Sequence, residues 1–132
     1  IYVNSKNILN NLYDRLTRDS FPVSYIHGDM HSSEREKNLS DFKKGTTRIM
    51  LSTDLLSRGI DIQQLSLVIN YDLPIQKETY IHRIGRSGRY GRKGVAINFV
   101  TDRDLQDLEE LQTFYNTKID VMPQNIDEII SV

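Results

Sequence analysis

Residues 48–52 of the chain read Arg-Ile-Met-Leu-Ser, and this short apolar run is the starting point for the fold class. Four further runs rich in apolar and β-branched side chains lie on either side of it, at residues 1–3, 23–26, 67–70 and 95–100. Consecutive runs are about 20 to 27 residues apart, which leaves room for a helix between two strands. The runs are nearly continuous rather than alternating, as strands covered on both faces require. The sequence therefore predicts an α/β fold with a mostly parallel central sheet flanked by helices.

Helix signals fill the segments between these runs. Ser5 can cap a first helix whose apolar residues share one face, and Ser33 with Glu36 predicts a capping box at the start of a second helix. Gly45 follows two lysines and suits the exit of that second helix. Thr101 and the acidic residues after it predict the start of a further helix.

Length and composition indicate one ordinary domain, which we expect to span residues 1–132. The chain has no cysteine, so a disulfide scaffold, a thiolate metal site and a cysteine nucleophile are excluded. No apolar run reaches the roughly 18 to 20 residues that a membrane span needs, and we expect no membrane partner. With 17 basic and 18 acidic residues the net charge is -1, so any nucleic-acid partner must be read from local chemistry.

The most informative local segment is His-Arg-Ile-Gly-Arg-Ser-Gly-Arg at residues 82–89. Its arginines are three residues apart and are separated by glycines, so planar cationic groups can converge on a polyphosphate. This is the chemistry of an arginine finger in phosphoryl transfer. The alternative from composition alone is a basic, glycine-rich surface loop.

Four strings in register carry a family resemblance. They are HGDM at residues 27–30, STDLLSRGID at 52–61, YDLP at 71–74 and HRIGRSGR at 82–89. With them the chain resembles the carboxy-terminal RecA-like lobe of the DEAD-box RNA helicases, in particular the translation initiation factor 4A group with its exon-junction relative. The resemblance covers essentially the whole chain. It implies a RecA-like three-layer domain, and a fragment that starts at or within the first strand of that domain.

For the nucleotide, the resemblance implies that Arg86 and Arg89 reach the γ-phosphate of ATP. Asp61 would accept a hydrogen bond from the ribose, with Gly59 beside it. ATP with Mg²⁺ would be held mainly by an amino-terminal lobe, because this chain has neither a phosphate loop nor an Asp-Glu-Ala-Asp string. We therefore expect negligible ATP hydrolysis by residues 1–132 alone.

For RNA, the resemblance implies that Thr53 and the backbone at Gly28 and Asp29 hold phosphates, together with Arg35. Contacts of this kind position a strand without reading its bases. One departure from the family pattern lies at Ser32, where the family usually has glutamine. Serine is shorter than glutamine, so the resemblance does not carry the glutamine contact over to this position.

Three further residues match family positions that couple the nucleotide site to the neighbouring lobe, namely His82, Arg83 and Arg58. The alternatives are a capping histidine, a surface arginine and a local salt bridge. Asp54 is better read as the cap of a short helix than as a metal ligand. The histidines lack a flanking carboxylate arrangement, so we expect no zinc site.

Taken together, the resemblance implies one lobe of an intracellular ATP-dependent RNA helicase, cytoplasmic or nuclear, with a link to translation. Its expected partners are RNA of any sequence, the amino-terminal lobe, and a scaffold protein of the initiation-factor or exon-junction type. Two alternatives stay open: a noncatalytic RecA-like module that docks onto a scaffold, and a DNA helicase lobe.

Overall fold

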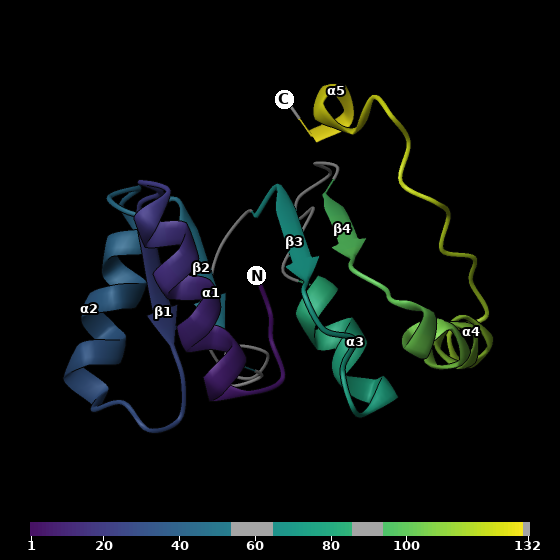
Figure 1. The fold of residues 1–132 in the computed structure, drawn as a ribbon, viewed down its shortest axis with the longest axis horizontal. Coiled ribbons are helices and arrows are strands. Elements are labelled where there is room, and N and C mark those ends of the chain that lie inside the picture. The colour runs from purple at the N-terminus through teal and green to yellow at the C-terminus, as the bar shows by residue number, and fades with distance from the viewer. Residues whose placement is uncertain (54–64, 86–93, 131–132) are drawn as a thin grey trace. The chain divides into compact units, whose positions relative to one another are not determined.

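The chain divides into two compact units, Ile1–Ile62 and Gln63–Val132. The computed structural model describes residues 1–53, 65–85 and 94–130 (Figure 1). Each unit has its own pair of parallel strands with at least one helix packed on it. The expectation of a single domain over residues 1–132 stays a prediction.

The first unit is built on the strands β1 (Val23–Ile26) and β2 (Ile49–Ser52). These strands are parallel, and Ile26 lies opposite Ser52 at their carboxyl ends. Tyr2 adds a parallel bridge to Ser52, so the opening residues also run alongside β2. The apolar runs predicted as strands at residues 23–26 and 48–52 are confirmed, as is their parallel direction.

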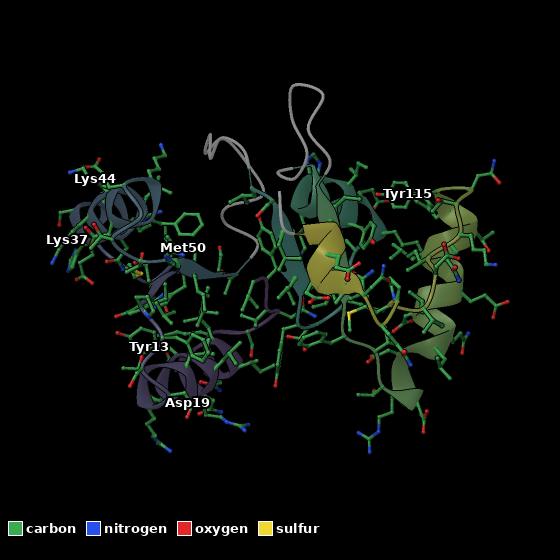
Figure 2. All side chains as sticks on the ribbon, turned by 90° about the horizontal axis from the view of Figure 1, so that it is seen from above. Tyr13, Asp19, Lys37, Lys44, Met50 and Tyr115 are labelled. Carbon is green, nitrogen blue, oxygen red and sulfur yellow. The ribbon has the colours of Figure 1, made fainter. Side chains whose placement is uncertain are left out.

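Helices α1 (Lys6–Arg18) and α2 (Ser32–Lys43) cover opposite faces of this strand pair, as Figures 1 and 2 show from two directions. The unit is thus a three-layer arrangement of helix, sheet and helix. Oγ of Ser5 accepts a hydrogen bond from the Ile8 N–H over 3.2 Å, which confirms the predicted cap of α1. The core on the α1 side is formed by fully buried side chains, namely Val3, Leu9 and Leu51.

The start of α2 differs from the prediction. The helix begins at Ser32 with His31 as its N-cap, and no side chain caps it. The predicted capping box of Ser33 and Glu36 is wrong, because Ser33 would have to be the N-cap and already lies inside the helix. At the far end Gly45 has a φ of 81°, a left-handed conformation that favours glycine, and the predicted exit is confirmed.

The second unit is built on β3 (Leu67–Asn70) and β4 (Val95–Asn98), which are also parallel, with Asn70 opposite Asn98. Helix α3 (Lys77–Ile84) follows β3 and packs on it. Helix α3 was not predicted from the sequence. Its eight residues include few apolar side chains and run directly into the glycine-rich segment, so the local pattern resembles a loop.

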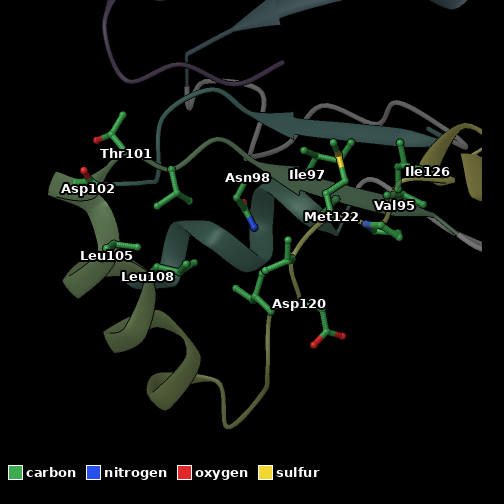
Figure 3. Close-up of a pocket in the computed structure, with 15 residues that line it drawn as sticks. Val95, Ile97, Asn98, Thr101, Asp102, Leu105, Leu108, Asp120, Met122 and Ile126 are labelled. Carbon is green, nitrogen blue, oxygen red and sulfur yellow. The ribbon is translucent and has the colours of Figure 1, made fainter.

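After β4 come the short 3-10 helix η2 (Asp102–Asp104), α4 (Leu105–Phe114) and α5 (Ile126–Ile130). Oδ2 of Asp104 accepts hydrogen bonds from both the N–H and the hydroxyl of Thr101, each over 2.9 Å, so the predicted helix start at Thr101 is confirmed. A groove of about 490 Å³ lies between β4, α4 and the segment that leads to α5 (Figure 3).

Candidate functional site

Both strands of the first unit end at the same edge of the sheet. Because Ile26 pairs with Ser52 in parallel register, residues 27–29 and Thr53 leave the strands side by side. The Thr53 N–H donates to the Ile26 carbonyl over 3.4 Å, and Oγ of Ser52 donates to the Thr53 carbonyl. The structure thus brings Thr53 next to the 27–29 loop. Carboxyl ends of parallel strands are where open α/β sheets bind ligands.

Gly28 is an exposed and uncrowded position of this loop. A Cβ placed on Gly28 would meet no heavy atom within 4 Å. Its φ lies outside the left-handed range, so the local conformation does not require glycine either. A glycine that neither packing nor backbone demands leaves room for a ligand to reach the main chain closely.

Asp29 is tied to two neighbours in the same loop region. Nζ of Lys6 lies 3.0 Å from Oδ2 of Asp29, and the Asp29 N–H donates to Nδ1 of His27 over 3.2 Å. The hydrogen bond from Lys6, followed by its charge, holds the pKa of Asp29 below its usual value of 3.8. The His27 ring is buried and stacks on Tyr25, with ring centroids 5.9 Å apart. Lys6 is a cation at this edge that the sequence analysis did not single out.

Arg35 lies in the first half of α2, the helix that begins directly after this loop. It is half-buried, and its Nε is buried with no hydrogen-bond partner in the described part of the chain. A buried donor left unpaired costs about 1 to 3 kcal/mol, so such a group is poised for an acceptor. Ser32, the residue that departs from the family pattern, is exposed at the first position of the same helix.

Helix α3 carries two of the predicted coupling residues, and their environments differ. His82 is exposed, whereas Arg83 is fully buried. Nη1 of Arg83 donates to the Asp72 carbonyl over 2.7 Å and to Oδ1 of Asn70 over 3.3 Å. The alternative of a surface arginine at position 83 is therefore wrong, because this guanidinium is bonded inside its own unit.

Sequence reasoning missed the polar partners of Arg83. Asn70 bonds to Asn98 on the neighbouring strand, and Asn98 bonds to Tyr80 on α3. A signal was present, because two apolar runs, LVIN and VAIN, both end in asparagine. A polar residue at the same position of two parallel strands indicates a shared contact at one sheet edge.

Five predicted site residues lie outside the described ranges, namely Arg58, Gly59, Asp61, Arg86 and Arg89, and so does Asp54. In residues 1–53, 65–85 and 94–130 no three histidine, aspartate or glutamate side chains gather into a metal-binding group. Over the same ranges, no helix combines the length and the apolar character that crossing a membrane takes.

Residues 1–91 match the helicase conserved C-terminal domain family. The chain belongs to this family. The match includes the loop at Gly28, the Thr53 edge and the whole of α3, whereas Asn98 on β4 lies beyond it. The resemblance to the carboxy-terminal RecA-like lobe of DEAD-box helicases and the predicted fold class are confirmed.

Known relatives agree in sequence and in structure. The ATP-dependent RNA helicase eIF4A of Eremothecium gossypii is 56% identical over 129 residues, which cover 98% of this chain and 33% of that protein. The C-terminal domain of the DEAD-box protein Dbp5 superposes with a TM-score of 0.84 at 40% identity, covering 98% of this chain and 77% of that one. S. cerevisiae Dbp5 bound to RNA and ADP BeF3 superposes with a TM-score of 0.88 at 40% identity, covering 98% and 35%. The chain spans about a third of the length of the curated relatives it matches.

Proposed function

We propose that the chain is the carboxy-terminal lobe of an ATP-dependent RNA helicase of the initiation factor 4A type. In this proposal the lobe contacts the phosphate backbone of single-stranded RNA, and its arginines take part in ATP hydrolysis. The names of its relatives support this proposal, and so does the Dbp5 structure that contains RNA and ADP BeF3. A scaffold protein of the initiation-factor or exon-junction type would regulate how the two lobes close.

The parallel register of β1 and β2 is the observation that carries the RNA part. It sets Thr53 beside the uncrowded loop at Gly28 and Asp29. The Thr53 hydroxyl and the main chain at Gly28 can approach phosphate oxygens there, and Arg35 has a buried Nε without a partner in the described part of the chain. Because all these contacts address the backbone, binding is independent of base sequence.

For the nucleotide, Arg86 and Arg89 would approach the γ-phosphate, and Asp61 with Gly59 would hold the ribose side. The amino-terminal lobe would hold most of the ATP together with its Mg²⁺. Water attacks the γ-phosphorus, the bond to the β,γ-bridging oxygen breaks, and ADP and phosphate leave. Arginines placed on the transferring group are worth about 10³- to 10⁵-fold in rate.

In the same proposal His82, Arg83 and Arg58 couple the nucleotide site to the neighbouring lobe. The exposure of His82 suits a direct contact. Arg83 is buried, so any coupling through it must pass through its own unit. Closure of the two lobes would complete the site, and hydrolysis would reopen it and release RNA.

The RNA part is tested by Thr53→Val in the full-length protein, which keeps the side-chain shape and removes the hydroxyl. We expect RNA affinity, measured by fluorescence anisotropy with an ATP analogue present, to fall about tenfold, because a hydrogen bond to a charged acceptor is lost. Thr46→Val is the matched control, since Thr46 is exposed in the loop after α2, beyond the amino end of β2. Unchanged affinity in Thr53→Val contradicts the proposed interface.

The two alternatives give different results with the unaltered full-length protein. RNA and DNA strands of equal length are compared as activators of ATP hydrolysis, because only RNA carries the 2′-hydroxyl. Activation by RNA alone supports the proposal, and equal activation by DNA favours a DNA helicase lobe. No turnover with either strand favours the noncatalytic scaffold-binding module.

A further inference from the structure

A chain of hydrogen bonds in the second unit starts and ends on α3. Nη1 of Arg83 donates to Oδ1 of Asn70 over 3.3 Å, and Nδ2 of Asn70 donates to Oδ1 of Asn98 over 2.8 Å. Nδ2 of Asn98 then donates to the hydroxyl of Tyr80 over 3.0 Å. Tyr80 and Arg83 are three residues apart and so lie on one face of the helix. The three hydrogen bonds and the helix backbone between Tyr80 and Arg83 together close a loop through these four residues, which we call the α3 ring.

Three of the four residues of the α3 ring are buried, and Asn98 is half-buried. Arg83 and Asn70 are 0% exposed, and Tyr80 is 6% exposed. Hydrogen bonds in such surroundings are stronger than in water, and each partner that is removed leaves a costly unpaired group. A polar ring of this kind therefore permits one arrangement of the helix, whereas an apolar contact tolerates small rotations and slides.

The ring holds α3 at two points on two strands. Arg83 is anchored to β3 through Asn70, and Tyr80 is anchored to β4 through Asn98. One anchor would leave the helix free to turn about it, but two anchors on different strands fix both its rotation and its position along its axis.

The exit of α3 is equally constrained. The Gly85 N–H donates to the Ile81 carbonyl over 2.8 Å, and a Cβ on residue 85 would lie 2.8 Å from the same oxygen. The chain can follow this tight path only because residue 85 is glycine. Arg86 is the next residue in the sequence, so α3 is the described element that precedes the glycine-rich segment.

We propose that the α3 ring is a positioning device for the arginines of the glycine-rich segment. Tyr80, Asn98, Asn70 and Arg83 touch no substrate in this account. They act through Arg86 and Arg89 by fixing the helix from which that segment emerges. The inference rests on the proposed function of those two arginines. In it Arg83 contributes to coupling through its bonds inside its own unit.

The test is a double-mutant cycle in the full-length protein, with RNA-stimulated ATP turnover as the readout. We expect Tyr80→Phe to lower kcat about tenfold with KM for ATP and RNA within twofold of wild type, because a small misplacement of a catalytic group is costly. Arg86→Ala should lower kcat about a thousandfold. The loss in the double variant should be smaller than the product of the two single losses, because part of the effect of Tyr80 is exerted through Arg86.

Tyr13→Phe is the matched control. Tyr13 lies on α1 and packs against the core of the first unit, so its hydroxyl is no part of the α3 ring. This variant loses one phenolic hydroxyl, as Tyr80→Phe does, and we expect its kcat to stay within twofold of the wild-type value. Asn98→Leu, which opens the ring from β4, should behave as Tyr80→Phe does.

The outcomes separate this inference from its premise. One outcome is that Arg86→Ala removes most of kcat and that the loss from Tyr80→Phe multiplies with it in the double variant. This outcome overturns the positioning role and leaves the proposed function standing. Unchanged kcat in both Tyr80→Phe and Asn98→Leu also overturns the positioning role. Unchanged kcat in Arg86→Ala overturns the proposed function, and the positioning role with it.

Discussion

Asn70 and Asn98 occupy the last positions of two parallel strands and face each other, with Nδ2 of Asn70 donating to Oδ1 of Asn98 over 2.8 Å. This pair joins β3 and β4 by side chains where the backbone ladder ends. The amide oxygen of Asn70 accepts from Arg83 while its nitrogen donates to Asn98, so both ends of one buried side chain are used.

Replacing Asn70 should therefore destabilise the protein more than an ordinary polar substitution. Asn70→Leu leaves the Arg83 Nη1 and the Asn98 Oδ1 without this partner, and we expect the free energy of unfolding to fall by about 1 to 3 kcal/mol. Urea denaturation measures it. Asn10→Ala, at an exposed position of α1, should change the free energy by about 0.5 kcal/mol or less. Equal losses in the two variants would show that the ring contributes no specific stability.

Two glycines should respond differently to the same substitution. Gly85→Ala places a methyl group 2.8 Å from the Ile81 carbonyl oxygen, and we expect a loss of about 1 kcal/mol or more in the free energy of unfolding. Gly28→Ala meets no atom within 4 Å and should leave that free energy unchanged.

The second glycine also tests the RNA edge. Because the methyl group in Gly28→Ala would stand between the main chain and a bound phosphate, RNA affinity should fall several-fold without a change in stability. The same protein samples serve for urea denaturation and for RNA anisotropy. A stable Gly28→Ala variant with wild-type RNA affinity would place RNA elsewhere.

The Lys6–Asp29 ion pair gives a pH prediction. The pKa of Asp29 is lowered in the folded protein, first by the hydrogen bond from Lys6. Its stabilising contribution is therefore present above the unfolded value of 3.8 and is lost as the pH falls through the lower folded pKa. NMR titration of the Asp29 carboxyl should give a midpoint below 3.8 that moves upward in Lys6→Met. A midpoint that Lys6→Met leaves in place would remove Lys6 as the cause.

Much of the fold could be predicted because its signals are local. The apolar runs at residues 23–26 and 67–70 became strands, and the run at 95–100 did so over its first four residues, since spacing and β-branched composition suffice to identify them. The caps at Ser5 and Thr101 were predictable because side chains within three residues of each helix start decide them. By contrast, α3 was missed because its residues are held by tertiary hydrogen bonds, which periodicity does not register.

The candidate site divides in the same way. Thr53 and Gly28 could be paired from the sequence, because parallel strands bring their carboxyl ends to one edge. The burial of Arg83 could not, since an arginine is placed on the surface by default and its partners lie 13 and 11 residues away. The Lys6–Asp29 pair spans 23 residues and depends on how α1 meets the loop after β1.

RNA-stimulated ATP hydrolysis by the full-length protein carrying Arg86→Ala or Arg89→Ala is the most direct test of the proposed helicase lobe. The account predicts that kcat falls about a thousandfold or more while much of the ATP and RNA affinity is retained, because these arginines act on the transferring phosphoryl group. Arg103→Ala, at an exposed position of η2, should leave kcat unchanged. Wild-type turnover in Arg86→Ala and Arg89→Ala would contradict the account.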